Sequence, residues 1–262
     1  MNAFFSALWA ETLKAKRSKV PLLTTLGFLI LPFVSGLFMI ILKDLEGAKD
    51  MGLISTKAQL VGGVADWPSH FGMLAMGAGV AGSILFSIIT AWVFGREFSD
   101  HTAKELLALP TPRWVIVTAK FVLIALLTLA ITLLVFIVGY GIGLTVEIPG
   151  LSAELTWSSF QSLLLIGFLT FMLMPVVALI ASIGRGYLLP LGWAFLSMAL
   201  AQIAAVMGWG EWFPWAVPSL LSDFAGPQTE PLGMHSYLMV FLVFITGTVA
   251  TLLWWQRADQ AQ

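Results

Sequence analysis

Six long apolar runs, separated by short polar segments, dominate the pattern of this chain. Each run has about 20 residues or more, the length that a helix needs to cross the hydrocarbon core of a bilayer. Barrel strands would be shorter and would alternate in polarity. The pattern therefore predicts an all-α, polytopic membrane protein with six transmembrane helices. The predicted spans are 20–42, 71–94, 115–146, 160–183, 188–207 and 237–255.

The composition agrees with a chain embedded in lipid. Of its 262 residues, 59% are hydrophobic and 10% are charged, whereas a soluble domain has about 25% charged residues. A formal net charge of −1 gives no support for nucleic-acid binding. The chain has no Cys, so it has no disulfide and no thiolate metal site. We expect one transmembrane domain over residues 1–262.

The Lys and Arg residues predict how the chain is oriented. With the N-terminus in the cytoplasm, ten of them lie inside and three outside, so the positive-inside rule favours both termini in the cytoplasm. The segments 147–159 and 208–236 contain no Lys or Arg, which fits an outer face. The ten are Lys14, Lys16, Arg17, Lys19, Arg96, Lys104, Arg113, Lys120, Arg185 and Arg257, and the three are Lys43, Lys49 and Lys57.

Two segments outside the spans predict interfacial structure. In 1–19, Phe5, Leu8 and Trp9 share one helical face ahead of a basic cluster, which predicts an interfacial helix before the first span. The alternative is an ordinary cytoplasmic flank that only satisfies the charge bias. The outer segment 208–236 is rich in Trp, Pro and Gly, which indicates short interfacial or re-entrant helices before the last span.

Small residues recur every four positions in two spans. Ala75, Gly79 and Ser83 lie on one face of the second span, and Gly139 and Gly143 repeat the spacing in the third. Small residues let helix backbones approach closely in lipid. We predict helix packing at these five positions, within one chain or between two.

Seven of the chain's 27 charged residues lie in the short segment from Gly95 to Lys120, and the runs on either side have none. Thr102 and Glu105 fit a capping box, which predicts a short helix from residue 103 that Pro110 ends. An amphipathic helix of this length is not stable alone in water, and it therefore needs to pack against either the membrane surface or a groove of a partner protein. Its acidic residues disfavour anionic headgroups and favour the groove.

The same stretch, "GREFSDHTAKELLALPTPRWVIVTAKFV", resembles the cytoplasmic loop of ABC type-2 transporter permeases. His101 stands where that family usually has Gly. The six-span layout and the flanking interfacial helices are similar as well, and the finer likeness is to the drug and peptide-antibiotic export and immunity branch. The matching residues, in order, are Glu97, Thr102, Leu106, Leu107, Pro110, Arg113 and Lys120.

The resemblance implies a permease subunit that moves an amphipathic cargo out across a bacterial-type cytoplasmic membrane. It implies two copies of a separate ABC ATPase subunit, a second permease chain, identical or paralogous, and a cytoplasmic coupling loop over 95–119. ATP and Mg would be bound by the ATPase, with no cofactor in this chain. The residues it assigns to the ATPase contact are Glu97, Asp100, Thr102, Glu105, Leu106, Leu107 and Arg113.

Two basic residues near the third span have alternative roles. Arg113 would pair either with an acidic group of the partner or with Glu97, or it would anchor in the headgroups. For Lys120 the preferred interpretation is headgroup anchoring, with its stem along the apolar surface. The apolar runs contain no Asp, Glu or Arg, which disfavours an ion-coupled carrier and indicates a driving force from a partner.

Catalytic and metal motifs are missing from the sequence. There is no Walker A motif, so the chain is expected not to be an enzyme itself. His70, His101 and His235 are isolated; His70 and His235, at the outer ends of spans, are interpreted as interface residues, not metal ligands. An intramembrane enzyme is the least favoured alternative, and a non-pumping immunity or sensor scaffold is the main one.

Overall fold

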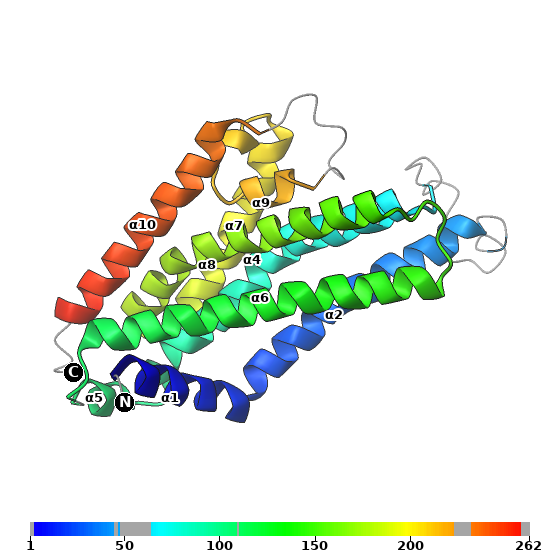
Figure 1. Ribbon diagram of the computed structural model, residues 1–262. Coiled ribbons are helices and arrows are strands. Elements are labelled where there is room, and N and C mark those ends of the chain that lie inside the picture. Colours follow the sequence, from blue (N-terminus) through cyan, green and yellow to red (C-terminus); the bar gives the residue numbers. More distant parts are fainter. Residues whose placement is uncertain (1–2, 45–46, 48–63, 109, 223–231, 258–262) are drawn as a thin grey trace.

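The computed structural model describes residues 3–44, 47, 64–108, 110–222 and 232–257, and its described part is helical throughout (Figure 1). Six of its helices are long and apolar enough to cross a membrane. The elements are α1 (Ala3–Arg17), α2 (Lys19–Lys43), α4 (Trp67–Ser99), α5 (Ala103–Leu107), α6 (Arg113–Thr145), α7 (Ala153–Ile183), α8 (Leu188–Val206), η2 (Gly210–Trp212), α9 (Val217–Leu220) and α10 (Met234–Arg257).

All six predicted spans are confirmed, and the observed helices are mostly longer. The second span, expected over 71–94, becomes α4 and continues to Ser99, while α6 already begins at Arg113. The expected loop 95–119 therefore shrinks to the residues between these two helices, with α5 inside it. The prediction was too long because charged residues can continue a helix beyond the apolar run that signals it.

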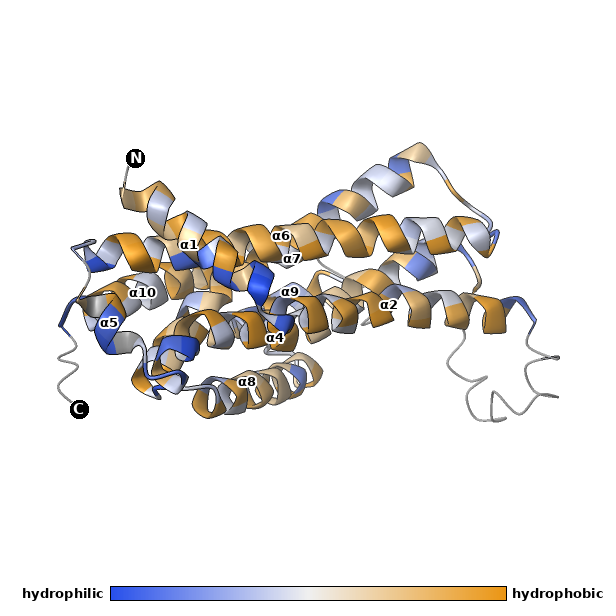
Figure 2. Cartoon of the chain, turned by 90° about the horizontal axis from the view of Figure 1, so that it is seen from below, coloured by the Kyte–Doolittle hydropathy of each residue, from blue (hydrophilic) through white to orange (hydrophobic). Residues whose placement is uncertain are grey.

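The bundle is organised around α7, which is the most buried of the six long helices. It packs along α4 on one side and α10 on another, and α2, α6 and α8 complete the bundle. Both termini, α1 and α5 lie at one end (Figure 1), which we call the proximal end. The other end, with Trp67, η2 and α9, is the distal end. Hydrophobic residues run along the long helices, and polar ones gather at the ends and at the α1–α2 junction (Figure 2).

Four helices end in the same hydrogen-bonded motif. At the end of α4, the N–H of Thr102 donates to the carbonyl of Glu97 at 2.9 Å, and the N–H of His101 donates to that of Phe98 at 3.3 Å. This is the Schellman pattern, which requires a left-handed residue after the helix. The left-handed residues are His101 (φ 58°), Glu147 (φ 55°), Arg185 (φ 50°) and Gly208 (φ 78°).

Close helix packing occurs within the chain at three of the five predicted small positions. A Cβ at Gly79 would lie 2.8 Å from the Cα of Ser219, so α9 packs directly on the α4 backbone. Gly139 and Gly143 of α6 leave room for Leu74 and Trp67 of α4. Ser83 instead donates to the carbonyl of Gly79 at 2.9 Å, and Ala75 is only partly buried against the core.

In its described residues, the segment 208–236, which was expected on the outer face, contains the short helical pieces η2 and α9. Ala216 and Val217 are fully buried, so α9 is tucked into the distal end of the bundle against α4 and α7. Residues 223–231 of this segment, like Lys49 and Lys57, lie outside the described part of the chain.

Candidate functional site

The candidate site is the proximal end, where α5 is joined to α4 by a tight turn. His101 occupies the left-handed position of that turn, a conformation that Gly adopts more easily than other residues. His101 therefore forms this left-handed turn although it carries a Cβ. The turn reverses the chain within three residues and sets α5 against the end of α4.

The helix α5 presents a polar face to its surroundings. Lys104 and Glu105 are exposed, whereas Leu106 is half-buried and packs against the core of the chain itself. Leu106 therefore helps to hold α5 on the bundle, and its assignment to the ATPase contact stays a prediction. The side chain of Leu107 lies outside the described residues.

The predicted capping box at the start of α5 is not formed. Thr102 is the N-cap residue, but its side chain makes no capping hydrogen bond. Its φ of −95° and ψ of 0° lie outside the extended conformation that directs an N-cap hydroxyl to the helix N–H groups. The Schellman motif at the end of α4 already fixes the backbone of Thr102. Both motifs cannot form at the same residue, and the structure contains the Schellman motif.

Next to the turn lies a buried ionic network of two carboxylates and two ammonium groups. Lys120 has no exposed surface, and its Nζ donates to Glu97 Oε1 at 2.7 Å, to Glu11 Oε2 at 3.2 Å and to the Val93 carbonyl at 2.7 Å. Lys14 Nζ lies 2.6 Å from Glu11 Oε1 and 3.0 Å from Glu97 Oε1. The four charges cancel, which is what allows Lys120, Glu97 and Glu11 to be buried, while Lys14 remains 27% exposed.

The network joins three elements at one point: α1 through Glu11 and Lys14, α4 through Glu97, and α6 through Lys120. Glu97 Oε2 is buried without a hydrogen-bond partner among the described residues. Burial opposes the charge of Lys14, but Glu97 and Glu11 outweigh it and raise the pKa of Lys14 above its ordinary value. Lys14 is therefore charged at neutral pH.

Two expectations for this region are corrected. Glu97 is only 2% exposed, so it faces the bundle and not a partner surface. Lys120 does not reach the headgroups, because opposite charges within 3.2 Å hold it inside. The sequence did carry one signal, since a Lys within an apolar helix requires a partner. Glu11 was missed because it belongs to a segment that was interpreted only by its apolar face.

Arg113 does not pair with Glu97. Its Nη1 donates to the carbonyls of Trp255 and Gln256, both at 3.2 Å. These are among the last carbonyls of α10, where a cation is favoured by the helix dipole. The start of α6 is thereby tied to the end of α10, a role that reading the loop alone could not show.

Asp100 remains at the surface of the proximal end, as expected for a contact residue. Its carboxylate pairs with Arg96 at 3.4 Å, and more than half of its side chain is exposed. An exposed pair of this kind contributes little stability. Asp100, Lys104 and Glu105 therefore present charge that a partner could bind.

At the distal end, His70 is fully buried, so its interpretation as an interface residue is wrong. Its Nδ1 lies 2.7 Å from Ser35 Oγ and its Nε2 lies 2.9 Å from the carbonyl of Gly139. His235 is partly exposed and stacks on Trp212 with the ring centroids 4.3 Å apart. Within the described ranges, no three His, Asp or Glu side chains are grouped to hold a metal ion.

The fold and this site define a class: a multi-pass helical membrane protein with a charged helical turn mounted on one end of its bundle. Comparison with known proteins narrows the class. The family model described as ABC-2 family transporter protein matches residues 7–201. The chain therefore belongs to the ABC-2 family of transporter proteins, and it is a multi-pass protein of the bacterial cytoplasmic membrane.

One curated relative extends the comparison. The chain is 24% identical over 176 residues to the bacitracin transport permease protein BCRB of Bacillus licheniformis, covering 67% of this chain and 84% of that protein. The chain is therefore similar to a permease that is named for the transport of an antibiotic.

Proposed function

We propose that this chain is the permease subunit of an ATP-driven exporter, and that α5 docks on a separate ATP-hydrolysing subunit. The observation that carries the proposal is the mounting of α5: its polar residues Lys104 and Glu105 are exposed, while Leu106 fixes it to the core. A short helix that is held rigidly and presents both charge signs suits a protein groove better than an anionic lipid surface.

The ionic network supports the same role. The turn that carries α5 begins at the Schellman end of α4, and Glu97 in that end is clamped to Lys120 of α6 and Lys14 of α1. A displacement of α5 would therefore move α4, α6 and α1 together. Two permease chains and two ATPase subunits form the assembly we propose, with both termini in the cytoplasm.

The cargo we propose is an amphipathic peptide antibiotic or a molecule of similar character. The relative named for bacitracin transport makes bacitracin the first compound to test. Cells that contain the chain and its ATPase partner should export bacitracin, and inverted vesicles that contain both should accumulate it only when ATP is supplied. ATP turnover and binding without net movement would instead favour a non-pumping immunity scaffold.

The docking role is tested by exchanging two charges on α5. Lys104→Glu combined with Glu105→Lys keeps the net charge and touches no buried group, so the chain should fold, yet ATP-dependent transport should fall by about tenfold or more. Lys16→Glu, an exposed change on α1, is the matched control and should transport normally. Normal transport by the exchanged variant would reject α5 as the coupling element.

The orientation is tested by labelling, because the chain has no native Cys. Lys104→Cys should be protected from an impermeant thiol reagent outside intact cells, whereas Ala153→Cys, exposed at the start of α7, should react. The reverse pattern would overturn the proposed topology.

A further inference from the structure

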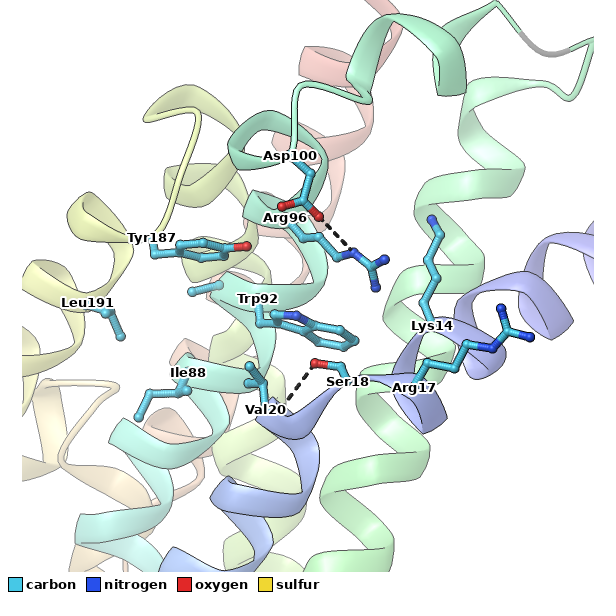
Figure 3. A pocket seen from close by; sticks show the side chains of 11 residues that line it. Lys14, Arg17, Ser18, Val20, Ile88, Trp92, Arg96, Asp100, Tyr187 and Leu191 are labelled. Atoms are coloured by element: carbon cyan, nitrogen blue, oxygen red, sulfur yellow. Dashed lines mark hydrogen bonds and ion pairs between the residues drawn. The ribbon is translucent and has the colours of Figure 1, made fainter.

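A hollow of about 550 Å³ opens at the proximal end, between the α1–α2 junction, α4 and α8 (Figure 3). We propose that it binds an anionic phospholipid, with the phosphate headgroup at the proximal rim and the start of the acyl chains along the apolar wall. The hollow contains no residue of α5, although Asp100 belongs both to its rim and to the charged surface beside α5, and the proposal goes beyond the proposed transport function.

The rim of the hollow is cationic. Arg17 is exposed and makes no ion pair in the described part of the chain, and Arg96 lies over the Trp92 ring at 5.5 Å from its centroid. Asp100 is the only carboxylate among the lining residues, and it pairs with Arg96 at 3.4 Å. Lys14 also lines the rim, but Glu11 and Glu97 neutralise it. Arg17 and Arg96 against Asp100 leave one net positive charge.

Two hydroxyl groups accompany these cations. Ser18 and Tyr187 both line the hollow, and burial together with nearby Asp100 raises the pKa of Tyr187, despite its hydrogen bond to Ser99. The phenol therefore keeps its proton and can donate. Guanidinium and hydroxyl donors around one space match the oxygens of a phosphate.

The rest of the wall is apolar and lies farther into the bundle. Val20 of α2, Ile88 of α4 and Leu191 of α8 form it, and all three lie below Arg96 and Asp100 in Figure 3. Ile88 and Arg96 are eight residues apart on one helix, which is about 12 Å along its axis. The hollow thus changes from polar to apolar over the distance from a headgroup to the first acyl carbons.

The surroundings favour a lipid over a free anion. The helices that line the hollow carry exposed apolar side chains close in sequence to the lining residues. Leu23 of α2, three residues after Val20, is 62% exposed, and Leu188 of α8, three residues before Leu191, is 88% exposed. Free phosphate would leave the apolar wall unused, and a zwitterionic lipid would leave the net positive charge unmatched.

The test uses the purified full-length chain in detergent, with lipid binding followed by native mass spectrometry. Phosphatidylglycerol should bind saturably and about tenfold more tightly than phosphatidylcholine with the same acyl chains. Arg17→Gln combined with Arg96→Gln should weaken phosphatidylglycerol binding by about tenfold, whereas Lys16→Gln, which removes an exposed charge outside the hollow, should not. Millimolar glycerol 3-phosphate should not compete.

A variant that binds phosphatidylglycerol more tightly than the wild type separates a specific effect from misfolding, because a misfolded chain would only lose affinity. Asp100→Asn removes the carboxylate that competes for Arg96, so it should tighten phosphatidylglycerol binding several-fold. Equal affinity for both lipids, wild-type binding by the double variant, or weaker binding by Asp100→Asn would each overturn the proposal. Competition by glycerol 3-phosphate would show a phosphate site that does not require a lipid, and would overturn it as well.

Discussion

The two ends of the bundle bury polar groups in opposite ways. At the proximal end, Lys120 is fully buried and is held by the carboxylates of Glu97 and Glu11. At the distal end, His70 is equally buried, but it is held by a hydroxyl of Ser35 and the carbonyl of Gly139. One end uses ion pairs and the other uses hydrogen bonds to uncharged groups.

The difference shows what each end joins together. The distal cluster links α2, α4 and α6, which are already packed as neighbouring spans. The proximal network adds α1, a helix outside the six spans, because the ammonium of Lys120 has three N–H donors: α4 supplies two acceptors, Glu97 and the Val93 carbonyl, and Glu11 of α1 supplies the third. A buried charge must be matched more completely than a buried neutral group, so it draws in an additional element.

Removing the ammonium of Lys120 should have the largest effect. Lys120→Met leaves Glu97 and Glu11 buried with too little positive charge, so the free energy of unfolding should fall by about 3–5 kcal/mol. Unfolding in detergent by a denaturant titration measures the change. Lys16→Met, on an exposed residue, is the control and should stay within about 0.5 kcal/mol of wild type.

A second substitution identifies the cause of that loss. Lys120→Met combined with Glu97→Gln removes one charge of each sign and should recover part of the lost stability. If the single variant unfolds like the wild type, the ion pairs do not stabilise the proximal end.

Removing the imidazole of His70 should cost less, because no charge is left without a partner. His70→Ala leaves Ser35 Oγ and the Gly139 carbonyl with unmet hydrogen bonds, so the free energy of unfolding should fall by about 1–3 kcal/mol in the same assay. His235→Ala, at a partly exposed His of the same end, should cost under about 1 kcal/mol. A larger loss from His70→Ala than from Lys120→Met would reverse the comparison.

Relieving the left-handed position of His101 should produce a small gain. His101→Gly should raise the free energy of unfolding by up to about 1 kcal/mol, because Gly adopts this conformation without a Cβ clash but is more flexible when unfolded. Glu147→Gly tests the same motif on the distal side, since Glu147 has φ 55°. If His101→Gly destabilises the chain, the imidazole of His101 makes a contact that stabilises the fold by more than the left-handed backbone conformation destabilises it.

Lys14 should lose its proton only at alkaline pH, and the stability of the folded chain should fall there and not at neutral pH. Its pKa in the folded chain is raised above the ordinary value of 10.5, so its contribution is complete below that pH and is lost as the pH rises through the folded pKa. Melting temperatures measured from pH 7 to 11.5 should therefore fall more steeply for the wild type than for Lys14→Met. Parallel curves would place Lys14 outside the network.

The sequence by itself determined the six spans and the place of the short helix α5 between two of them. Apolar runs long enough for a bilayer must be helical, because lipid offers no hydrogen bonds to an open backbone. The position of α5 followed from the Pro110 stop and from the charge gathered between two uncharged runs. These signals are local in the sequence, so they can be interpreted without knowing which helices pack together.

Only the tertiary structure decided which charges meet. Glu11 and Lys120 are 109 residues apart, and Arg113 reaches carbonyls 142 and 143 residues away. Helical periodicity assigns a face to each side chain but not the helix opposite it. The same limit hid the burial of Glu97 and His70, because a polar residue near a span end faces water or the bundle according to how its helix is packed.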